Sequence, residues 1–318
     1  MDFKEKLNLY TNYANQVVCS FLPEEKGYHK TILEAMNYSV INGGKRLRPV
    51  MMLTAFELIR SRRNAECPPA VPDSAEVDFA GGRILSDEEK DVVGPFMAAM
   101  EMIHSSSLVH DDLPCMDNDT LRRGKLSTWA KFGEDTGTLA GDALMLYAFE
   151  TAAKSKAAPA AALKAIYVLA EKSGVSGMVG GQTVDVELTG RKPSAKQLEF
   201  IYKNKTGALI EASLMIGAIL AGAAADEVET IRKAALDIGM AFQIRDDILD
   251  VISTNEELGK NVGSDAEDGK ITWLTYYGRE QSENDVLRFT AGAIDGVRSL
   301  GGHEFLEALL RYLVDRKN

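Results

Sequence analysis

Two short acidic segments carry the residue types in this sequence that could do chemistry. The stretch "HDDLPCMDND", residues 110–119, sets four aspartates directly after the apolar-rich run "FMAAMEMIHSSSLV". A second stretch, "FQIRDDILD" at 242–250, also follows an apolar helical segment. Carboxylates beside buried segments are costly to desolvate unless they are paired or bound to metal. Because magnesium prefers oxygen ligands and bridges carboxylates to substrate phosphates, the two segments predict a diphosphate held between them by magnesium.

The spacing of the second cluster groups its carboxylates. On a helix, Asp246 and Asp250 lie on one face, and Asp247 lies about 100° round it. A single D-D-x-x-D is expected by chance about once in a chain of this size, and its ordinary interpretation is a solvated helix face. Because there are two such clusters, each after an apolar segment, we expect instead that they face each other across one metal site.

The first cluster departs from simple helical spacing. Asp111 and Asp117 are six residues apart and would point about 120° away from each other on a regular helix. Pro114 disfavours an uninterrupted helix at this point. We therefore expect the helix to end or distort near Leu113, with an irregular turn that brings Asp117 back.

Basic residues stand in two compact groups near the acidic ones. The segment "GGKRLRP" at 43–49 places Lys45, Arg46 and Arg48 after a glycine pair at an expected helix start, where free backbone N–H groups also favour an anion. The segment "LRRG" at 121–124 follows the first acidic cluster. An isolated arginine pair is more often a solvated face, but this placement favours phosphate binding.

The elements that must position these residues are predicted to be helices. Apolar residues recur at helical spacing almost everywhere, and no segment gives a convincing strand pattern. We predict an all-α fold in which residues 1–318 form one domain, a single large helical bundle. Residues 207–224 are apolar or small nearly all round, which suits a central helix. Three prolines and a Gly-Gly pair within 61–91 predict a long, irregular surface loop.

Composition excludes several classes of protein. The net charge of −11 argues against nucleic acid or an anionic membrane surface as partner, although metal and arginine can still make one pocket attract an anion. We find no apolar run near the ~18–20 residues of a membrane span, and therefore expect a cytoplasmic protein without stable membrane insertion. The three cysteines lack metal-ligand spacing and are expected to be reduced thiols.

An ordered set of motifs resembles one family. In chain order they are "GGKRLRP", "SLVHDDLPCMDND", "RRGK", "GGQTVD" at 180–185, "KTGAL" at 205–209, "FQIRDDILD" and "GKNVGSD" at 259–265. This set resembles the trans-prenyltransferases, the short-chain isoprenyl diphosphate synthases of the farnesyl and geranylgeranyl diphosphate synthase family. The resemblance implies the isoprenoid synthase fold, built around a central cavity, and a homodimer.

The resemblance also implies the reaction. Isopentenyl diphosphate would condense head-to-tail with dimethylallyl, geranyl or, for a twenty-carbon product, farnesyl diphosphate, with release of diphosphate. The product would be farnesyl or geranylgeranyl diphosphate. The magnesium-bound diphosphate would leave as the allylic C–O bond ionises, and the isopentenyl double bond would attack the resulting carbocation.

Roles for individual residues follow from the same resemblance. Three magnesium ions on the allylic diphosphate would be held by Asp111, Asp112, Asp117, Asp246, Asp247 and Asp250. That diphosphate would also contact Arg122, Lys205 and Lys260. Isopentenyl diphosphate would be held by Lys45, Arg48, His104 and Arg123, although a lone histidine is otherwise most often a core residue. The carbocation would be stabilised by Thr206 and Gln243, with Tyr202 a weaker candidate and His110 a supporting residue.

Product length depends on the helix that carries the first cluster. The residues one turn before Asp111, here Ser105, Ser106 and Ser107, are expected to form the floor of the cavity. Farnesyl-producing relatives commonly have an aromatic residue where this sequence has Ser106, so a deeper pocket and a twenty-carbon product are predicted. The alternative is that Met100, Met102 or another helix closes the pocket at fifteen carbons. The family also more often has aspartate at Thr120 and histidine near Trp129.

Three other functions are compatible with parts of the sequence. A class I terpene cyclase would share the fold and metal use but has no need of "GGKRLRP" or His104. A His-Asp phosphohydrolase is suggested by "HD" at 110–111, but four histidines are few for its ligand set. A non-catalytic partner subunit of another prenyl synthase usually lacks one aspartate cluster, whereas this chain has both.

Overall fold

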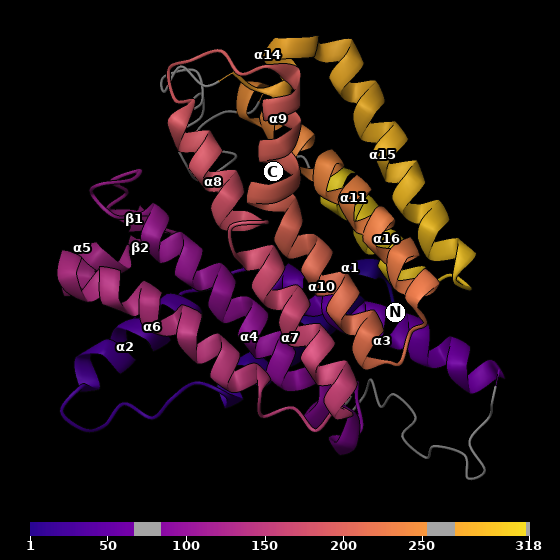
Figure 1. Ribbon diagram of the computed structural model, residues 1–318, viewed down its shortest axis with the longest axis horizontal. Coiled ribbons are helices and arrows are strands. Elements are labelled where there is room, and N and C mark those ends of the chain that lie inside the picture. Colours follow the sequence, from indigo (N-terminus) through magenta and orange to yellow (C-terminus); the bar gives the residue numbers. More distant parts are fainter. Residues whose placement is uncertain (67–83, 253–270, 316–318) are drawn as a thin grey trace. The chain divides into compact units, whose positions relative to one another are not determined.

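The structure is a computed structural model that describes residues 1–66, 84–252 and 271–315. The described residues are almost entirely helical (Figure 1). The helices are α1 Phe3–Ser20, α2 Lys30–Ile41, α3 Leu47–Glu66, α4 Asp87–Asp111, α5 Thr128–Phe132, α6 Glu134–Ala152, α7 Pro159–Ser173, α8 Met178–Glu187, α9 Ala195–Ile201, the π-helical turn η1 Tyr202–Thr206, α10 Gly207–Leu220, α11 Ala225–Ile252, α14 Trp273–Tyr277, α15 Arg279–Ser299 and α16 Glu304–Asp315. The strands in these ranges are β1 Leu121–Arg122 and β2 Lys125–Leu126. The all-α prediction is confirmed.

The chain divides into two compact units. The first unit contains residues 1–53 and 70–166, and the second contains residues 54–69 and 167–318. Helices α3 and α7 each contribute residues to both units. Each acidic cluster therefore belongs to a different unit, with Asp111 in the first and Asp246 in the second.

Helix α4 is the core helix of the first unit. It begins with a capping box, in which Ser86 Oγ accepts the Glu89 N–H and the Glu89 carboxylate accepts the Ser86 N–H. Residues 93–103 are buried throughout, and the helix packs mainly against α6 and α1. By length and composition alone α4 could cross a membrane, but 78% of its most apolar window is buried within the structure, as in a core helix. The expectation that no apolar run reaches that length is therefore corrected.

Helix α10 is the core helix of the second unit. Every residue from Gly207 to Leu220 is buried, as predicted for a central helix, but the helix ends four residues before the predicted end of the run at 224. The helix packs against α11, which packs in turn against α15. A Cβ at Gly239 would lie 2.9 Å from the Gly207 Cα, so a side chain there would push α10 and α11 apart.

The irregular stretch expected over 61–91 is narrower than predicted. Residues 61–66 continue helix α3, and residues 87–91 form the first turns of α4. Residues 84–86 lead into that helix and are buried. The prolines that suggested a loop lie at 68–72, outside the described residues. Cys19 and Cys115 are free thiols, as predicted, and Cys67 also lies outside the described residues.

Candidate active site

The first acidic cluster stands on a turn that closes the end of α4. The helix ends at Asp111, and the turn that follows contains Pro114. The Asp117 N–H donates to the Asp111 carbonyl oxygen over 2.9 Å, and Asn118 takes a left-handed conformation at φ 54°. This geometry confirms that the helix ends next to Leu113 and that the chain turns back to bring Asp117 beside Asp111.

Asp112, between these two residues, has a protein partner. Its side chain is buried, and its Oδ1 accepts from Arg122 Nε over 2.9 Å and also from Arg122 Nη2. Arg122 Nη2 donates in addition to Asp119 Oδ2 over 3.1 Å. Burial raises the pKa of the Asp112 carboxyl, while Arg122 acts in the opposite direction. Asp112 thus holds the arginine through Oδ1, and its role as a direct metal ligand stays a prediction.

A small hairpin gives Arg122 and Arg123 different directions. Strands β1 and β2 are antiparallel, with Arg122 opposite Lys125. Arg123 and Gly124 form the turn with φ values of 54° and 76°, the two left-handed positions of a type I′ turn. Arg122 points to Asp112, whereas Arg123 Nη1 donates to the Gly43 carbonyl oxygen.

Side chains from neighbouring helices hold this hairpin in place. The Tyr38 hydroxyl donates to the Leu126 carbonyl oxygen over 2.7 Å. Trp129 Nε1 donates to the Asp119 carbonyl oxygen over 2.9 Å. Asn42, at the end of α2, lies 3.5 Å from the Arg122 carbonyl oxygen. The arginines therefore stand on a braced turn and not on a loose loop.

A basic pocket in the first unit gathers all four residues predicted for isopentenyl diphosphate. Lys45, Arg48, His104 and Arg123 line one pocket of about 540 Å³. A Cβ at Gly44 would lie 2.7 Å from Arg123 Nη1, and Gly44 has φ 129°, so the second glycine of "GGKRLRP" lets the guanidinium approach.

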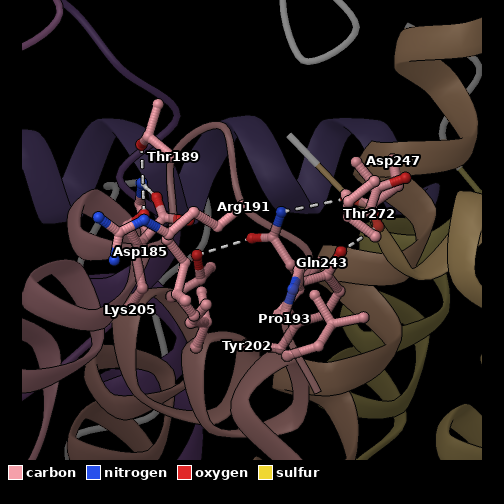
Figure 2. Close-up of a pocket in the computed structure, with 14 residues that line it drawn as sticks. Asp185, Thr189, Arg191, Pro193, Tyr202, Lys205, Gln243, Asp247 and Thr272 are labelled. Carbon is pink, nitrogen blue, oxygen red and sulfur yellow. Dashed lines mark hydrogen bonds and ion pairs between the residues drawn. The ribbon is translucent and has the colours of Figure 1, made fainter. Parts of the chain in front are cut away.

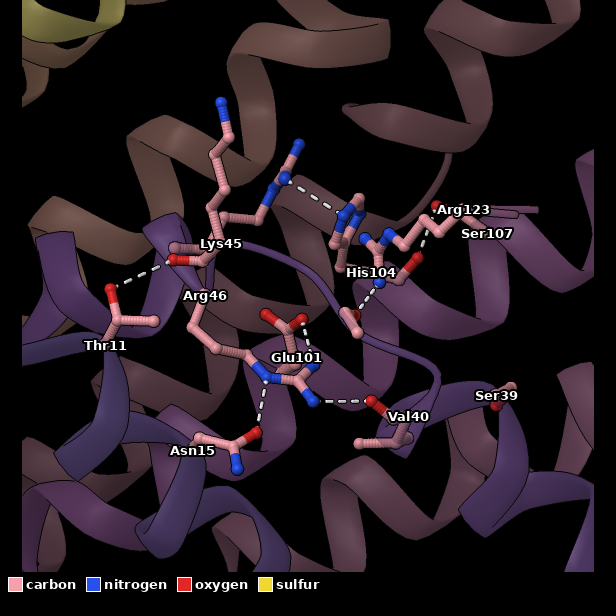
Figure 3. A network of polar contacts seen from close by, with 12 residues as sticks. Thr11, Asn15, Ser39, Val40, Lys45, Arg46, Glu101, His104, Ser107 and Arg123 are labelled. Carbon is pink, nitrogen blue, oxygen red and sulfur yellow. Dashed lines mark hydrogen bonds and ion pairs between the residues drawn. The ribbon is translucent and has the colours of Figure 1, made fainter. Parts of the chain in front are cut away.

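Arg46 differs from its basic neighbours because it builds the wall of this pocket. Its Nη1 forms a buried ion pair with Glu101 at 2.7 Å, and its Nη2 donates to the Val40 carbonyl oxygen over 2.6 Å. Its Nε donates to Asn15 over 3.1 Å (Figure 3). Glu101 is thereby engaged by Arg46, which leaves the pocket with a surplus of positive charge.

The electrostatics of this pocket favour a neutral histidine among cations. Arg48 Nη1 lies 3.2 Å from His104 Nε2. Burial, followed by the charges of Arg48 and Arg123, holds the pKa of His104 well below its usual range, so the neutral ring accepts from Arg48. Burial also lowers the pKa of Arg48 to about 10. The Arg48 Nε is buried and has no hydrogen-bond partner among the described residues, so the pocket offers an anion an unused donor.

The second unit places a π-helical turn at its candidate site. Residues Tyr202–Thr206 form η1, and π turns of this kind are frequent at functional sites. A Cβ at Gly181 would lie 2.2 Å from the Lys205 backbone nitrogen, so only glycine lets α8 approach η1. Lys205 Nζ pairs with Asp185 Oδ2 at 2.5 Å, a link between α8 and η1.

Three predicted residues meet at this turn, and Figure 2 labels two of them, Gln243 and Asp247. The Thr206 hydroxyl donates to Gln243 Oε1 over 2.7 Å. Gln243 Nε2 lies 3.5 Å from Asp247 Oδ1. All three, together with Lys205 and Asp185, line one pocket of the second unit. The prediction that Lys205, Thr206 and Gln243 share a site agrees with this arrangement.

The second acidic cluster also contains one aspartate with a protein partner. Asp247 Oδ2 accepts from the Tyr202 hydroxyl and from the Trp273 N–H, the latter over 2.9 Å. Asp247 therefore ties α11 to η1 and α14, and its role as a direct metal ligand stays a prediction. Tyr202, predicted as a weak candidate for cation stabilisation, is instead part of this buried link.

The remaining aspartates fit magnesium. Asp246 and Asp250 lie on one face of α11, and Asp250 is 7% exposed with no hydrogen bond to any described residue. Within the described residues, no three histidine, cysteine or acidic side chains form a metal cage of their own. Oxygen donors that leave coordination positions open suit magnesium, which keeps waters and takes substrate phosphate oxygens. Lys260 lies outside the described residues.

The serines predicted to set chain length are packed within α4. Ser106 is fully buried, and its hydroxyl donates to the Ile103 carbonyl oxygen over 2.8 Å. The Ser107 hydroxyl donates to the His104 carbonyl oxygen over 2.9 Å. Because each hydroxyl is satisfied by its own helix, these positions present small and largely apolar side chains.

Comparison with known proteins decides the family. The family model described as polyprenyl synthetase matches residues 29–294, which includes parts of both units. The chain belongs to the polyprenyl synthetase family. Membership confirms the predicted all-α isoprenoid synthase fold and the short-chain prenyltransferase reaction, and it supports the use of magnesium and diphosphate substrates.

Individual relatives of this polyprenyl synthetase agree. The chain is 40% identical to the heterodimeric geranylgeranyl pyrophosphate synthase large subunit 1, chloroplastic, of Arabidopsis thaliana, over 100% of this chain and 80% of the relative. It is 41% identical to a geranylgeranyl diphosphate synthase of Cyanophora paradoxa, over 92% and 90% of the two chains.

Solved structures give the same result. An FPP/GFPP synthase from Zymomonas mobilis superposes with a TM-score of 0.78 at 30% identity, over 98% of each chain. A geranyltransferase from Helicobacter pylori, complexed with magnesium and isoprenyl diphosphate, superposes with a TM-score of 0.75 at 28% identity, over 97% of this chain and 96% of that one.

Several residues that build these sites were missed by the sequence reading. Asp185 stands in the quoted motif "GGQTVD", which was the available signal for a partner of Lys205. Glu101, Tyr38 and Trp129 lie in none of the family motifs. Glu101 and Tyr38 contact residues far along the chain, whereas Trp129 contacts the nearby Asp119. These contacts are visible only in the structure.

Proposed function

We propose that the basic pocket of the first unit binds the diphosphate of isopentenyl diphosphate. The convergence of Lys45, Arg48, His104 and Arg123 in one concave pocket is the observation that carries this proposal. Glu101 is engaged by Arg46, and diphosphate oxygens would therefore be the acceptors for these donors. The neutral His104 ring can accept from Arg48 and so orient the guanidinium.

Steady-state kinetics of two variants of the β1–β2 hairpin test this proposal. Arg123→Ala should raise the KM for isopentenyl diphosphate about ten-fold or more, because a charge-assisted hydrogen bond is lost. The KM for the allylic substrate should change much less. Lys125→Ala is the matched control, since it removes a cation two positions away that does not line this pocket. Equal KM values for wild type and Arg123→Ala would contradict the assignment.

We propose that the pocket of the second unit binds the allylic substrate. Lys205, Arg122 and Lys260 contact the diphosphate of this substrate. The resemblance of the sequence to the family supports this role for all three. Magnesium would stabilise the negative charge of the departing diphosphate. Thr206 and Gln243 are fixed by their mutual hydrogen bond, so their oxygen dipoles can stabilise the allylic cation without reacting with it. The released diphosphate then accepts the proton lost from the adduct.

We propose four direct magnesium ligands and three ions. The ligands are Asp111, Asp117, Asp246 and Asp250, whereas Asp112 and Asp247 position Arg122 and Tyr202. Asp246→Ala should abolish turnover and leave the helical circular dichroism unchanged. Asp226→Ala, an exposed aspartate on the same helix, is the control and should keep full turnover. An unchanged rate in Asp246→Ala would remove the metal assignment.

We propose a homodimer, supported by apolar side chains that the structure leaves in solvent. On α6, Leu139 and Leu146 stand seven residues apart on one face and are 58% and 73% exposed. On α8, Val179 and Val186 repeat this spacing. Exposed apolar rows of this kind mark association surfaces. The named large subunits among the relatives also associate, in their case as heterodimers.

Light scattering after size exclusion tests the dimer. The wild type should have twice the mass of the 34.7 kDa chain, and Leu146→Asp should shift it to the monomer mass. A monomeric wild type would contradict the proposal.

We also propose a cytoplasmic location, supported by the free thiols Cys19 and Cys115, which suit a reducing compartment. Cell fractionation that recovers the protein from another compartment would contradict it.

A further inference from the structure

The charges that line the pocket of the second unit do not balance in pairs. Lys205 is compensated by Asp185, and Asp247 is engaged by Tyr202 and Trp273. Arg191 lines the same pocket and forms no ion pair with any described residue. Figure 2 shows its side chain beside those of Asp185 and Lys205. The pocket therefore contains two cations and two carboxylates, but among the described residues Arg191 forms no ion pair with either carboxylate.

We propose that Arg191 is an additional binding residue for the diphosphate of the allylic substrate. The inference rests on the proposed role of this pocket as the allylic site. Arg191 belongs to none of the motifs that identify the family, and its segment, "ELTGRKPS" at 187–194, was not predicted to bind anything. A guanidinium offers several N–H donors in a planar fork that matches phosphate oxygens, so it suits this ligand better than a single ammonium does.

The backbone around Arg191 forms a turn that is fixed by a hydrogen bond and a left-handed glycine. Helix α8 ends at Glu187, and Gly190 takes a left-handed conformation at φ 71°, which reverses the chain. The Arg191 N–H then donates to the Leu188 carbonyl oxygen over 2.8 Å. These features hold the Arg191 backbone at the rim of the pocket.

The residues after Arg191 fix the other end of this turn. Pro193 is buried and lines the same pocket. Ser194 begins α9 with a capping box that includes Gln197. Lys192 Nζ lies 5.5 Å from the ring centroid of Tyr276, a cation–π contact with α14. Lys192 thus contacts α14, whereas Arg191, on the same anchored turn, lines the pocket.

The exposure of Arg191 determines which kinetic constant it affects. Its side chain is exposed, so its interaction with a diphosphate is partly screened by solvent and salt. Such a cation would contribute to capture of the substrate in the ground state and in the transition state alike, which changes KM more than kcat. Its effect should also weaken as the ionic strength rises.

Calorimetric binding of inorganic diphosphate in the presence of magnesium tests the proposal without turnover. Arg191→Ala should raise the Kd about five-fold at low salt, a factor expected for a partly screened charged contact. Arg191→Lys should recover most of this loss, because it keeps the charge. Lys196→Ala removes an exposed cation on α9 that does not line the pocket and should bind as the wild type does.

Kinetics provide the second readout. Arg191→Ala should raise the KM for geranyl diphosphate by a similar factor, with the KM for isopentenyl diphosphate and kcat nearly unchanged. If Arg191→Ala and Lys196→Ala bind diphosphate equally well, the proposal is overturned even where the wild type forms product. If the wild type forms no product but Arg191→Ala still weakens diphosphate binding, the proposed function fails and the binding role of Arg191 stands.

Discussion

Asp112 and Arg122 form an ion pair that links the end of α4 to the hairpin, with two guanidinium nitrogens on one carboxylate oxygen. The Asp112 side chain is 3% exposed and that of Arg122 is 31% exposed. The pair therefore connects an aspartate of the first acidic cluster with a cation proposed for the allylic diphosphate. Because the Asp112 side chain is buried, breaking this ion pair should cost more stability than breaking an ion pair at the surface.

Removing the carboxylate of this pair should cost both stability and rate. Asp112→Ala leaves Arg122 without its buried partner, so the free energy of unfolding should fall by about 2 kcal/mol. Turnover should fall as well, because Arg122 loses its orientation. Urea denaturation and steady-state kinetics measure the two effects. Asp119→Asn removes only the exposed partner of Arg122 and should lower the free energy of unfolding by less than about 0.5 kcal/mol. Equal losses of stability in the two variants would contradict this ranking.

The partly buried histidine of the basic pocket predicts how stability depends on pH. Burial and the neighbouring arginines depress the pKa of His104 in the folded protein. The unfolded chain therefore binds a proton that the folded chain does not, and stability is lost as the pH falls. Below the unfolded pKa of about 6.5 the free energy of unfolding should decrease by up to about 1.4 kcal/mol per pH unit, and above it the contribution should be constant.

Substitution of this histidine isolates its contribution to the slope. His104→Gln keeps a neutral polar side chain at the position and cannot be protonated in this range. The free energy of unfolding of this variant, measured in urea at several values between about pH 7 and pH 5, should depend less steeply on pH than that of the wild type. Identical slopes would show that the pH dependence comes from other groups.

Two glycines allow a test of the two pockets separately. Gly181→Ala would place a Cβ 2.2 Å from the Lys205 backbone nitrogen, and Gly44→Ala would place one 2.7 Å from the Arg123 guanidinium. The first should raise the KM for the allylic substrate, and the second should raise the KM for isopentenyl diphosphate. Each clash should also lower stability by about 1–3 kcal/mol. If both variants raise the same KM, one pocket has been assigned to the wrong substrate.

The sequence predicts the all-α class, the acidic and basic motifs and the turn after α4. Each of these has a signal in neighbouring residues of the chain. Apolar periodicity gave the helices, and Pro114 with the six-residue spacing of Asp111 and Asp117 gave the turn after α4. Lys45, Arg48 and Arg123 stand in the family motifs, and His104 followed from the family resemblance. One pocket contains all four.

Other features depend on contacts that no local pattern records. Strands β1 and β2 have two residues each, which is too short for an alternating signal. The π turn at 202–206 lies where α8 approaches closely at Gly181, a contact between segments that are separate in the sequence. The ion pair of Asp112 with Arg122 and the hydrogen bonds of Asp247 with Tyr202 and Trp273 could not be read from the spacing of the aspartates.

Ser106 provides a test of product length. It is fully buried one turn before the first cluster, and no aromatic side chain stands at this position. We propose a twenty-carbon product, which the geranylgeranyl synthases among the relatives support. Ser106→Phe should shift the product towards fifteen carbons, whereas Ser106→Ala should leave it unchanged. Product chain length is read by mass spectrometry, and an unchanged product in Ser106→Phe would mean that Met100, Met102 or another helix forms the floor.

Product formation itself tests the central claim most directly. The purified protein would be incubated with magnesium, isopentenyl diphosphate and, in separate reactions, dimethylallyl, geranyl or farnesyl diphosphate, and the products would be identified by mass spectrometry. We expect each primer to be extended, farnesyl diphosphate to twenty carbons, and no extension when magnesium is chelated. Absence of product with every primer would contradict the assignment of this chain as a catalytic prenyltransferase and would favour a partner subunit that modulates another prenyl synthase.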